Sequence, residues 1–158
     1  MGKCTMKWLE LKIIPVAVVI ICSGLMILTA KLFPMYIIEL DLYKELAAVT
    51  FLLGIAVALA GVLNFKKAKT TVNPAKPENS SMIVDSGIYK LSRNPMYLGM
   101  FLALLALAIW LANSLVYLWL PIFLLYMQQF QIKPEERMLE KLFGEAFILY
   151  KSKVRRWI

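Results

Sequence analysis

The chain has 158 residues, of which 61% are hydrophobic, and its mean hydropathy is +0.70. It contains no histidine and only two cysteines, which argues against a zinc or haem site, histidine acid–base catalysis and a disulfide framework. The net charge of +8 comes from segments that flank apolar blocks, which suits contact with anionic lipid headgroups better than with nucleic acid. The composition therefore indicates a small integral membrane protein, in which any active site must be built from helix ends and loops.

The first two apolar blocks are predicted to span the membrane as helices. Residues 13–33 are almost uninterrupted apolar sequence, longer than the apolar core of about 7–15 residues in a signal peptide, so we expect a retained span. The second span, 46–65, contains Gly54 and Gly61, which lie on roughly one helix face. Small residues on one face allow a neighbouring helix to approach closely. We therefore expect a helix to pack there.

A long polar segment, 66–94, follows the second span. We interpret 82–84 as a short extended piece, Asp85-Ser86-Gly87 as a turn and 88–89 as its return. A loop of this length in so small a protein is usually either functional or disordered. Its turn-forming residues and embedded apolar side chains favour an ordered, functional loop.

Two more apolar blocks, 95–112 and 115–132, are separated only by Asn113-Ser114, which predicts a helical hairpin. At about 1.5 Å per residue the first of them is short for a hydrocarbon layer of about 30 Å. From residue 133 the sequence is amphipathic and basic, and we expect it to form an interfacial helix rather than to cross the membrane.

The distribution of basic residues predicts how these spans are oriented. All Lys and Arg residues except Lys31 and Lys44 lie in the N-terminal segment, in the 66–94 loop or from residue 133 onward. With four spans these segments fall on one side, which the positive-inside rule makes cytoplasmic. We therefore expect an all-α integral membrane protein with four transmembrane helices and one membrane domain over 1–158. Both termini are expected in the cytoplasm, and the membrane is expected to be a prokaryotic inner membrane.

Four short motifs occur in order within residues 83–150. They read Gly87-Ile88-Tyr89; Arg93-Asn94-Pro95-Met96-Tyr97-Leu98-Gly99; Glu135-Glu136-Arg137-Met138-Leu139; and Phe143-Gly144-Glu145-Ala146-Phe147-Ile148-Leu149-Tyr150. Their order and spacing resemble the isoprenylcysteine carboxyl methyltransferase and phospholipid methyltransferase superfamily. The resemblance implies a membrane methyltransferase that uses S-adenosyl-L-methionine and acts on a lipid-like or hydrophobic acceptor. That acceptor is a carboxylate such as isoprenylcysteine, or a thiol or an amine.

The resemblance also implies which residues bind the methyl donor and the acceptor. Many relatives have histidine where this chain has Asn94, which forms hydrogen bonds but does not titrate, so no proton transfer is assigned there. The acceptor-binding arginine of eukaryotic carboxyl methyltransferases corresponds here to Gln131, which argues against a prenylcysteine carboxylate. Cofactor contacts are carried over to the loop before the third span and the segment after the fourth: Ser81, Met82, Ile83, Val84, Tyr89, Asn94, Pro95, Met96, Tyr97 and Glu135.

Methyl transfer from a sulfonium is an in-line displacement that requires positioning rather than a metal ion. Arg93 is expected to pair with the carboxylate of the cofactor, and Glu135 or Glu136 with its ammonium, through charge-assisted hydrogen bonds. Tyr89 or Tyr97 is expected to stack on the adenine or to face the sulfonium. The sequence shows no evident general base, so the catalytic residue is left unassigned, and no metal is expected.

These residues also have structural interpretations. Asn94-Pro95 fits the N-cap and first turn of the third helix. Glu135 and Glu136 fit the first turn of a helix, where the dipole favours acids. The two tyrosines fit interfacial aromatic residues. Basic residues beside apolar segments fit lipid-facing anchors, namely Lys66, Lys67, Arg155 and Arg156.

Two other functions compete with methyl transfer. A small transporter usually needs an ionisable residue at membrane depth, whereas the charges here lie only at or beyond the ends of the spans. A non-catalytic membrane scaffold would use the cytoplasmic tail as a docking surface. Unlike an enzyme, such a scaffold should show no cofactor-dependent change in thermal stability.

Overall fold

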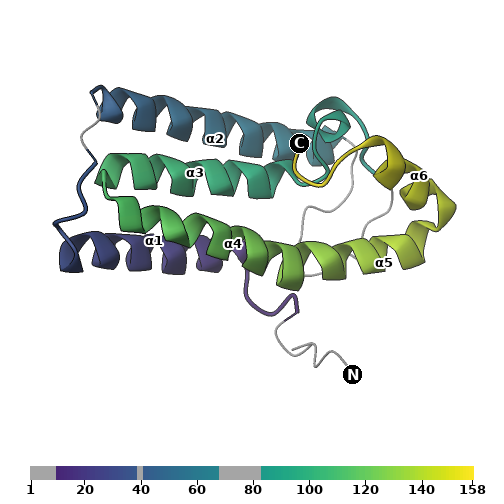
Figure 1. Ribbon diagram of the computed structural model, residues 1–158. Helices are drawn as coiled ribbons and strands as arrows, with labels where there is room; N and C mark the ends of the chain where they lie inside the picture. The colour runs from purple at the N-terminus through teal and green to yellow at the C-terminus, as the bar shows by residue number, and fades with distance from the viewer. Residues whose placement is uncertain (1–9, 39–40, 68–82) are drawn as a thin grey trace, which may run out of the picture.

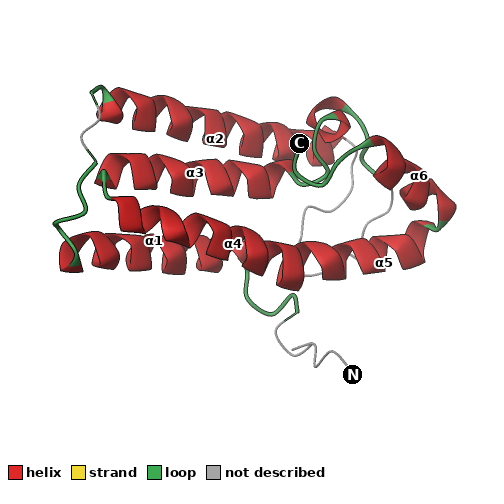
Figure 2. Ribbon diagram, in the orientation of Figure 1, coloured by secondary structure: helices red, strands yellow, loops and turns green. Residues whose placement is uncertain are grey.

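The computed structural model describes residues 10–38, 41–67 and 83–158, so the predictions for Ser81 and Met82 lie outside the described residues. Over these ranges the chain is helical and forms no strand (Figures 1 and 2). The predicted all-α fold is confirmed. The α-helices are α1 (Pro15–Leu32), α2 (Tyr43–Lys67), α3 (Pro95–Leu111), α4 (Trp119–Met127), α5 (Lys133–Phe143) and α6 (Glu145–Lys153), with short helical turns η3 (Gly87–Lys90), η4 (Ser114–Leu118) and η5 (Gln128–Ile132).

Three helices in the described ranges are long and apolar enough to cross a membrane: α1, α2 and the continuous helix Ser114–Phe143. The fourth apolar helix, α3, has 17 residues and lies between α2 and α4 (Figure 1). Its length is about 25 Å at 1.5 Å per residue, short of a hydrocarbon layer of about 30 Å. The number of crossings and their orientation therefore stay predictions.

Small residues set the contact between α2 and α3. Gly54 and Gly99 face each other, and a Cβ atom added at Gly99 would lie 2.6 Å from the Gly54 carbonyl oxygen and 2.7 Å from the Ala58 Cβ. Two turns along α2, a Cβ atom at Gly61 would lie 2.9 Å from the Met96 Cγ. The backbones of the two helices can approach this closely only because side chains are missing there. The prediction that a helix packs on Gly54 and Gly61 is confirmed, and that helix is α3.

The turn between α3 and α4 closes the end of the bundle that also holds the α1–α2 connection (Figure 1). Ala112 adopts a left-handed conformation with φ 46°, which ends α3. The Asn113 side chain accepts from the Leu115 N–H at 3.0 Å and donates to the Phe33 carbonyl at 2.8 Å. The predicted break at Asn113-Ser114 is therefore confirmed.

The helix that begins at Ser114 does not end before Lys133, where a separate interfacial segment was expected. Instead a π-helical turn, η5, joins α4 to α5, and α5 continues along the direction of α4 beyond the bundle (Figure 1). The cause is Pro134, which has no N–H for the carbonyl four residues earlier and crowds it. That carbonyl, of Phe130, accepts from the Leu11 N–H at 3.0 Å instead.

The loop before α3 contains a 3₁₀ turn, η3, where an extended return had been predicted at residues 88–89, so that prediction is wrong. Gly87 has a φ of 57°, a conformation that favours glycine. A Cβ atom there would lie 2.5 Å from the Asn64 side-chain nitrogen. Because Asn64 belongs to α2, only a residue without a side chain fits at this point, and the loop lies close to the end of that helix.

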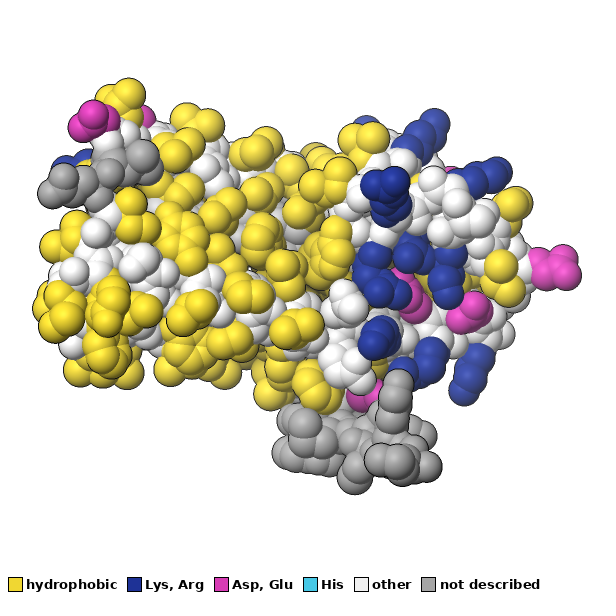
Figure 3. All heavy atoms as spheres, viewed as in Figure 1, with side chains coloured by type: hydrophobic (Ala, Val, Ile, Leu, Met, Phe, Trp, Pro, Cys, Tyr) yellow, Lys and Arg dark blue, Asp and Glu magenta, His cyan; other side chains and the backbone are white. Residues whose placement is uncertain are grey.

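Most basic side chains in view lie at one end of the molecule, and a smaller charged group lies at the other end (Figure 3). Apolar side chains cover most of the visible bundle, while Lys and Arg gather at the end formed by η3, α5, α6 and the C-terminus. The apolar interior is built mainly by α1, α3 and α4, with Met26, Leu104 and Phe123 among its fully buried side chains. Most of the basic residues that the structure describes therefore lie at one end of the bundle.

Candidate functional site

Three segments of the chain meet at the charged end of the bundle: residues 83–97, the start of α5, and the C-terminal tail 154–158 (Figure 1). They come from distant parts of the sequence and are joined by side-chain and backbone hydrogen bonds. We call this junction the polar end site, and define it by Tyr89, Arg93, Asn94, Tyr97, Glu135, Glu136 and Arg156.

Tyr97 and Glu135 form the contact between α3 and α5. Tyr97 lies in the first turn of α3 and is 4% exposed, and its hydroxyl donates a hydrogen bond to the Glu135 Oε1. Burial raises the pKa of Glu135 to about 8; the hydrogen bond from Tyr97 opposes this rise, and the charge of Glu136 adds to it. Near neutral pH the Glu135 carboxyl therefore holds a proton unless a cation approaches it.

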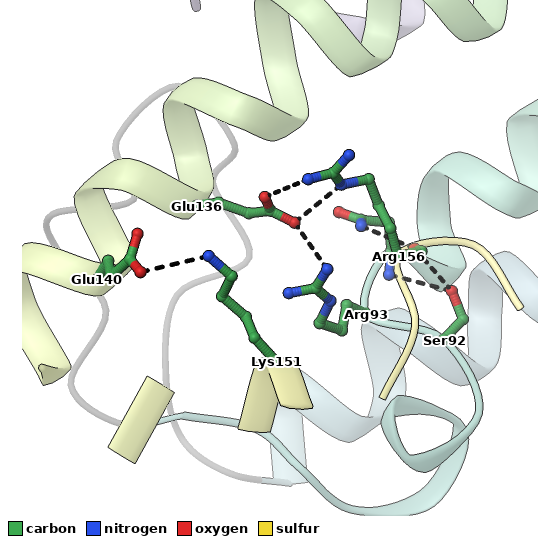
Figure 4. Close-up of polar contacts among 7 residues, drawn as sticks. Ser92, Arg93, Glu136, Glu140, Lys151 and Arg156 are labelled. Carbon is green, nitrogen blue, oxygen red and sulfur yellow. Dashed lines mark hydrogen bonds and ion pairs between the residues drawn. The ribbon is translucent and has the colours of Figure 1, made fainter. Parts of the chain in front are cut away.

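Glu136 is bound by two arginines. The Arg93 NH2 atom lies 3.2 Å from its Oε1, and Arg156 forms a fork of two hydrogen bonds, 3.0 Å from Nε to Oε1 and 2.7 Å from NH2 to Oε2 (Figure 4). Glu136 is only 8% exposed. A buried carboxylate is stable in such a place only when charged partners compensate it. Glu136 thus ties the C-terminal tail and the α3 loop to α5.

Backbone groups hold the tail as well. The Arg93 N–H donates to the Arg155 carbonyl at 3.1 Å, and the Asn94 side-chain amide donates to the Arg156 carbonyl at 2.9 Å. Asn94 is the residue before α3, but its side chain makes no capping hydrogen bond, so only the position of the predicted cap is right. The interpretation of Arg156 as a lipid-facing anchor is wrong, because its guanidinium turns inward to Glu136.

Tyr89 is buried at the edge of the polar end site, with 4% of its surface exposed. Its ring meets that of Phe65 edge-on at 5.2 Å, and its carbonyl accepts from the Tyr150 hydroxyl at 2.8 Å. Burial raises the pKa of the Tyr89 hydroxyl, as do the nearby Tyr150 and Glu135. Tyr89 therefore stays neutral and lies inside the protein, not at a lipid interface.

Arg93 has hydrogen-bond donors to spare. Its side chain is 10% exposed, and although NH2 reaches Glu136, the Nε and NH1 atoms are buried without a partner among the described residues. A buried donor left unsatisfied costs about 1–3 kcal/mol. Such a guanidinium suits an anionic ligand, because its free N–H donors form charge-assisted hydrogen bonds to carboxylate oxygens. This is the feature of the site that most clearly calls for a ligand.

The other predicted site residues lie around this centre. Pro95 and Met96 pack against Gly61 of α2. Val84 is buried and Ile83 is partly buried in the loop before η3. Gln131 is fully buried on η5, one helical turn before Glu135. The structure thus brings Arg93, Tyr97, Glu135 and Glu136 together, while the cofactor contacts of each residue stay predictions.

The helix-start interpretation of Glu135 and Glu136 does not fit the structure. The α5 helix continues from η5, so its first N–H groups do not form an open helix end that would favour acids or bind an anion. Both carboxylates are instead directed into contacts with Tyr97, Arg93 and Arg156. Among the described residues, no group of three or more Cys, Asp or Glu is placed to hold a metal ion.

Sequence reasoning missed two parts of the site. Arg156 lies twenty residues after its partner Glu136, and a basic residue near a chain end gave no local signal of an inward contact. Tyr150 belongs to the last of the four motifs, so its position was noted, but not its hydrogen bond to the Tyr89 carbonyl. Both contacts depend on the turn at Gly144, which directs α6 and the tail back toward η3.

Comparison with known proteins places this architecture in a family. The family model described as phospholipid methyltransferase matches residues 42–146, from the start of α2 into α6. The chain belongs to the phospholipid methyltransferase family. As a methyltransferase-family chain with long apolar helices, it is an integral membrane protein. The superfamily resemblance seen in the four motifs is confirmed.

Two curated relatives match different shares of this chain. An uncharacterized protein of Haemophilus influenzae is 52% identical over 63 residues, 40% of this chain and the whole of that protein. The Protein-S-isoprenylcysteine O-methyltransferase of Saccharomyces cerevisiae is 35% identical over 82 residues. That match covers 50% of this chain and 33% of the yeast protein. No solved structure matches this family member.

Proposed function

We propose that this chain is an S-adenosyl-L-methionine-dependent methyltransferase that binds its methyl donor at the polar end site. The observation that carries the proposal is Arg93, a nearly buried guanidinium whose Nε and NH1 have no partner among residues 10–38, 41–67 and 83–158. When bound, S-adenosyl-L-methionine supplies an electrophilic methyl group on a sulfonium. The remaining work is positioning, for which a rigid set of hydrogen bonds is sufficient.

The two neighbouring glutamates divide this work. Glu136 is already neutralised by Arg93 and Arg156, so its role is to fix the direction of Arg93. Within the described part of the chain, the Glu135 carboxyl has one side-chain hydrogen-bond partner, the neutral Tyr97 hydroxyl, so it is the carboxylate left to receive the ammonium of the cofactor. Arg93 then receives the carboxylate at the other side of the same methionine end. Tyr97 orients Glu135 throughout.

The proposed acceptor has an apolar portion that lies in the membrane. An apolar cavity of about 450 Å³ lies between α1, α2 and α3, and its lining includes Ser23, Phe51, Ala103 and Trp110. Its nearest α3 residue, Ala103, is six residues from Tyr97, about 9 Å along the helix. The rest of the lining lies farther from that site, toward Ala47 of α2 and Trp110 of α3, so an acceptor needs a hydrocarbon chain that extends past Ala103 to use this cavity while its head stays near the polar end site.

We further propose that the polar end site faces the cytoplasm in a prokaryotic inner membrane. Lys and Arg gather at this end of the bundle (Figure 3), whereas the opposite end holds Asp41 and Glu45 beside Lys44. Basic residues are retained on the cytoplasmic side. The methyl donor, which is water-soluble, would reach the site from there.

The proposal is tested by titrating the purified protein in detergent with S-adenosyl-L-homocysteine in a calorimeter. Arg93→Ala and Glu135→Ala should each weaken binding by about tenfold or more, because each removes a charge-assisted hydrogen bond of about 1.5–3 kcal/mol. Lys66→Ala, an exposed residue at the end of α2, is the matched control and should bind like the natural protein. Equal affinity in all three variants would rule out this site, and absent binding in the natural protein would favour the scaffold.

A further inference from the structure

The segment before α1, residues 10–14, passes beside the junction of α4 and α5 and is bound to it (Figure 1). Leu11 donates its backbone N–H to the Phe130 carbonyl at 3.0 Å. Ile13 accepts at its carbonyl from the side-chain amide of Gln131 at 2.6 Å. Both partners belong to the π-helical turn η5. We call residues 10–14 the N-terminal strap.

An ion pair extends the strap onto α5. The carboxylate of Glu10 pairs with the guanidinium of Arg137, and their side chains are 18% and 52% exposed. Arg137 directly follows Glu135 and Glu136 in the same helix. Because successive residues are about 100° apart around a helix, Arg137 lies on the side of α5 away from these two carboxylates. The strap and the polar end site therefore hold one turn of α5 from two sides.

The strap supplies a partner that η5 itself cannot provide. In this turn the Lys133 N–H bonds to the Gln128 carbonyl, five residues earlier, as in a π-helix. Pro134 has no N–H for the Phe130 carbonyl, and the N–H of Leu11 takes that place. Backbone acceptors inside a protein need such partners, because an unpaired one costs free energy. The geometry of η5 is therefore supported by the strap.

Leu11 adopts a backbone conformation that leucine rarely takes. Its φ is 57°, in the left-handed region where residues other than glycine are uncommon. Such conformations cost free energy and persist only where the surrounding structure holds them, often at functional sites. Here the conformation lies in the turn that brings the Leu11 N–H to the Phe130 carbonyl. The strap is thus shaped to reach η5, not only to lead into α1.

We propose that the N-terminal strap is a positioning element of the polar end site: it holds η5 in its π-helical form and thereby directs Glu135 and Glu136 into that site. The strap residues act through α5, not by contact with the methyl donor. A one-residue change in the pitch of η5 corresponds to a rotation of about 100°, which would separate both carboxylates from their partners. This inference rests on the proposed function, because donor binding is the activity that the strap supports.

The alternative is a strap that only anchors α1 to the bundle. Its loss would then lower stability without changing how Glu135 binds a cation. The pH profile separates the two roles, because burial raises the pKa of Glu135 to about 8, and binding a cation there expels a proton. The other ionisable groups described around this carboxyl are two neutral tyrosines and an ion-paired cluster: Tyr97, Tyr89, Glu136, Arg93 and Arg156.

The test titrates variants of the whole chain in detergent with S-adenosyl-L-homocysteine between pH 6 and 7.5. Leu11→Pro removes the donor N–H and does not allow a positive φ, whereas Leu11→Gly keeps both and is its matched control. Leu11→Pro should weaken binding by about five- to tenfold, the worth of one hydrogen bond, and should lose most of the rise of affinity with pH. Leu11→Gly should bind like the natural protein.

A second variant tests the strap without altering its backbone. Glu10→Arg places a second guanidinium against Arg137 and should weaken binding by about two- to fivefold, because the ion pair is partly exposed. Lys12→Ala changes an exposed side chain of the same segment and should have no effect. If Leu11→Pro does not fold, Glu10→Arg decides the question by the same measurements.

Hydrogen exchange without ligand adds a measurement that does not depend on the cofactor. In Leu11→Pro the amides of η5 and of the first turn of α5 should exchange about tenfold faster, while those of α2 keep their protection. Unchanged exchange in that variant would overturn the inference, and so would a lower affinity whose rise with pH is intact. If the natural protein does not bind S-adenosyl-L-homocysteine, the proposed function is wrong, and the exchange data alone decide whether the strap holds η5.

Discussion

Two contacts of α3 illustrate different ways of fixing a helix. Along its length α3 meets α2 through Gly54, Gly61 and Gly99, with backbones in close approach and no charged group involved. At its N-terminal end it meets α5 and the tail through Tyr97, Arg93 and their acidic partners. Within the hydrocarbon, shape is the main source of specificity between apolar helices. At the end of the bundle, buried charges supply this specificity, because a buried charge without a partner costs much free energy.

The largest expected effect tests the charged contact. Glu136→Ala leaves the guanidinium groups of Arg93 and Arg156 without their carboxylate, and Arg93 is nearly buried, so we expect a loss of about 3–5 kcal/mol in stability. Glu140→Ala is the matched control on the same helix. Its ion pair with Lys151 at 3.3 Å is partly exposed, and its removal should cost less than about 1 kcal/mol. Unfolding midpoints in detergent measure both, and similar losses would contradict the role given to Glu136.

The glycine contact is tested by adding a single methyl group. In Gly99→Ala the new Cβ lies 2.6 Å from a backbone oxygen that cannot move aside, so α2 and α3 must separate, at a cost of about 1–3 kcal/mol. Gly24→Ala on α1 is the control, because nothing lies within 4 Å of its added Cβ. It should be neutral or stabilising by up to about 1 kcal/mol, since alanine favours helix. A harmless Gly99→Ala would mean that the helices are not in this contact.

The last expected effect is a pH dependence of cofactor binding. The pKa of Glu135, about 8 because of burial, means that binding a cation must first expel a proton. Affinity should therefore rise by close to tenfold per pH unit between about pH 6 and 7.5. Calorimetry in buffers of different ionisation enthalpy measures the proton released on binding. In Glu135→Gln both this proton release and the pH dependence of affinity should disappear. If the slope persists in that variant, another group is responsible.

The same raised pKa of Glu135 makes the stability of the unliganded protein fall as the pH rises, whereas cofactor affinity rises. Because the folded state binds this proton more tightly than the unfolded chain, the contribution of Glu135 to stability is present below its ordinary pKa and is lost as the pH rises toward about 8. A ligand that supplies a cation restores stability at the upper end of this range. Stability and affinity should thus move in opposite directions between pH 6 and 7.5.

Features encoded locally were predictable from the sequence. The apolar blocks gave the helices, Gly54 and Gly61 gave the face where α3 packs, and Asn113 marked the turn of the hairpin. In each case the relevant residues lie within one helix or one turn, so spacing alone carries the information.

Features that depend on distant contacts were not predictable. The break expected before α5 is absent, because a proline in this context widens a turn instead of ending the helix. The inward turn of Arg156 requires the whole path of α6 and the tail, and a basic residue near a chain end has the same local pattern whether it faces lipid or protein. The four motifs indicated which residues gather, but not that Glu136 would be shared by two arginines.

The π-helical turn η5 also sets the rotation of α5 relative to α4 around their common axis. It holds one residue more than an α-turn, and one residue corresponds to a rotation of about 100° around the helix axis. Deleting a residue from η5 would leave the face that α4 presents to the bundle intact, yet would swing Glu135 and Glu136 away from Tyr97 and Arg93. A length change of one residue at this point would therefore take the polar end site apart while α4 kept its place in the bundle.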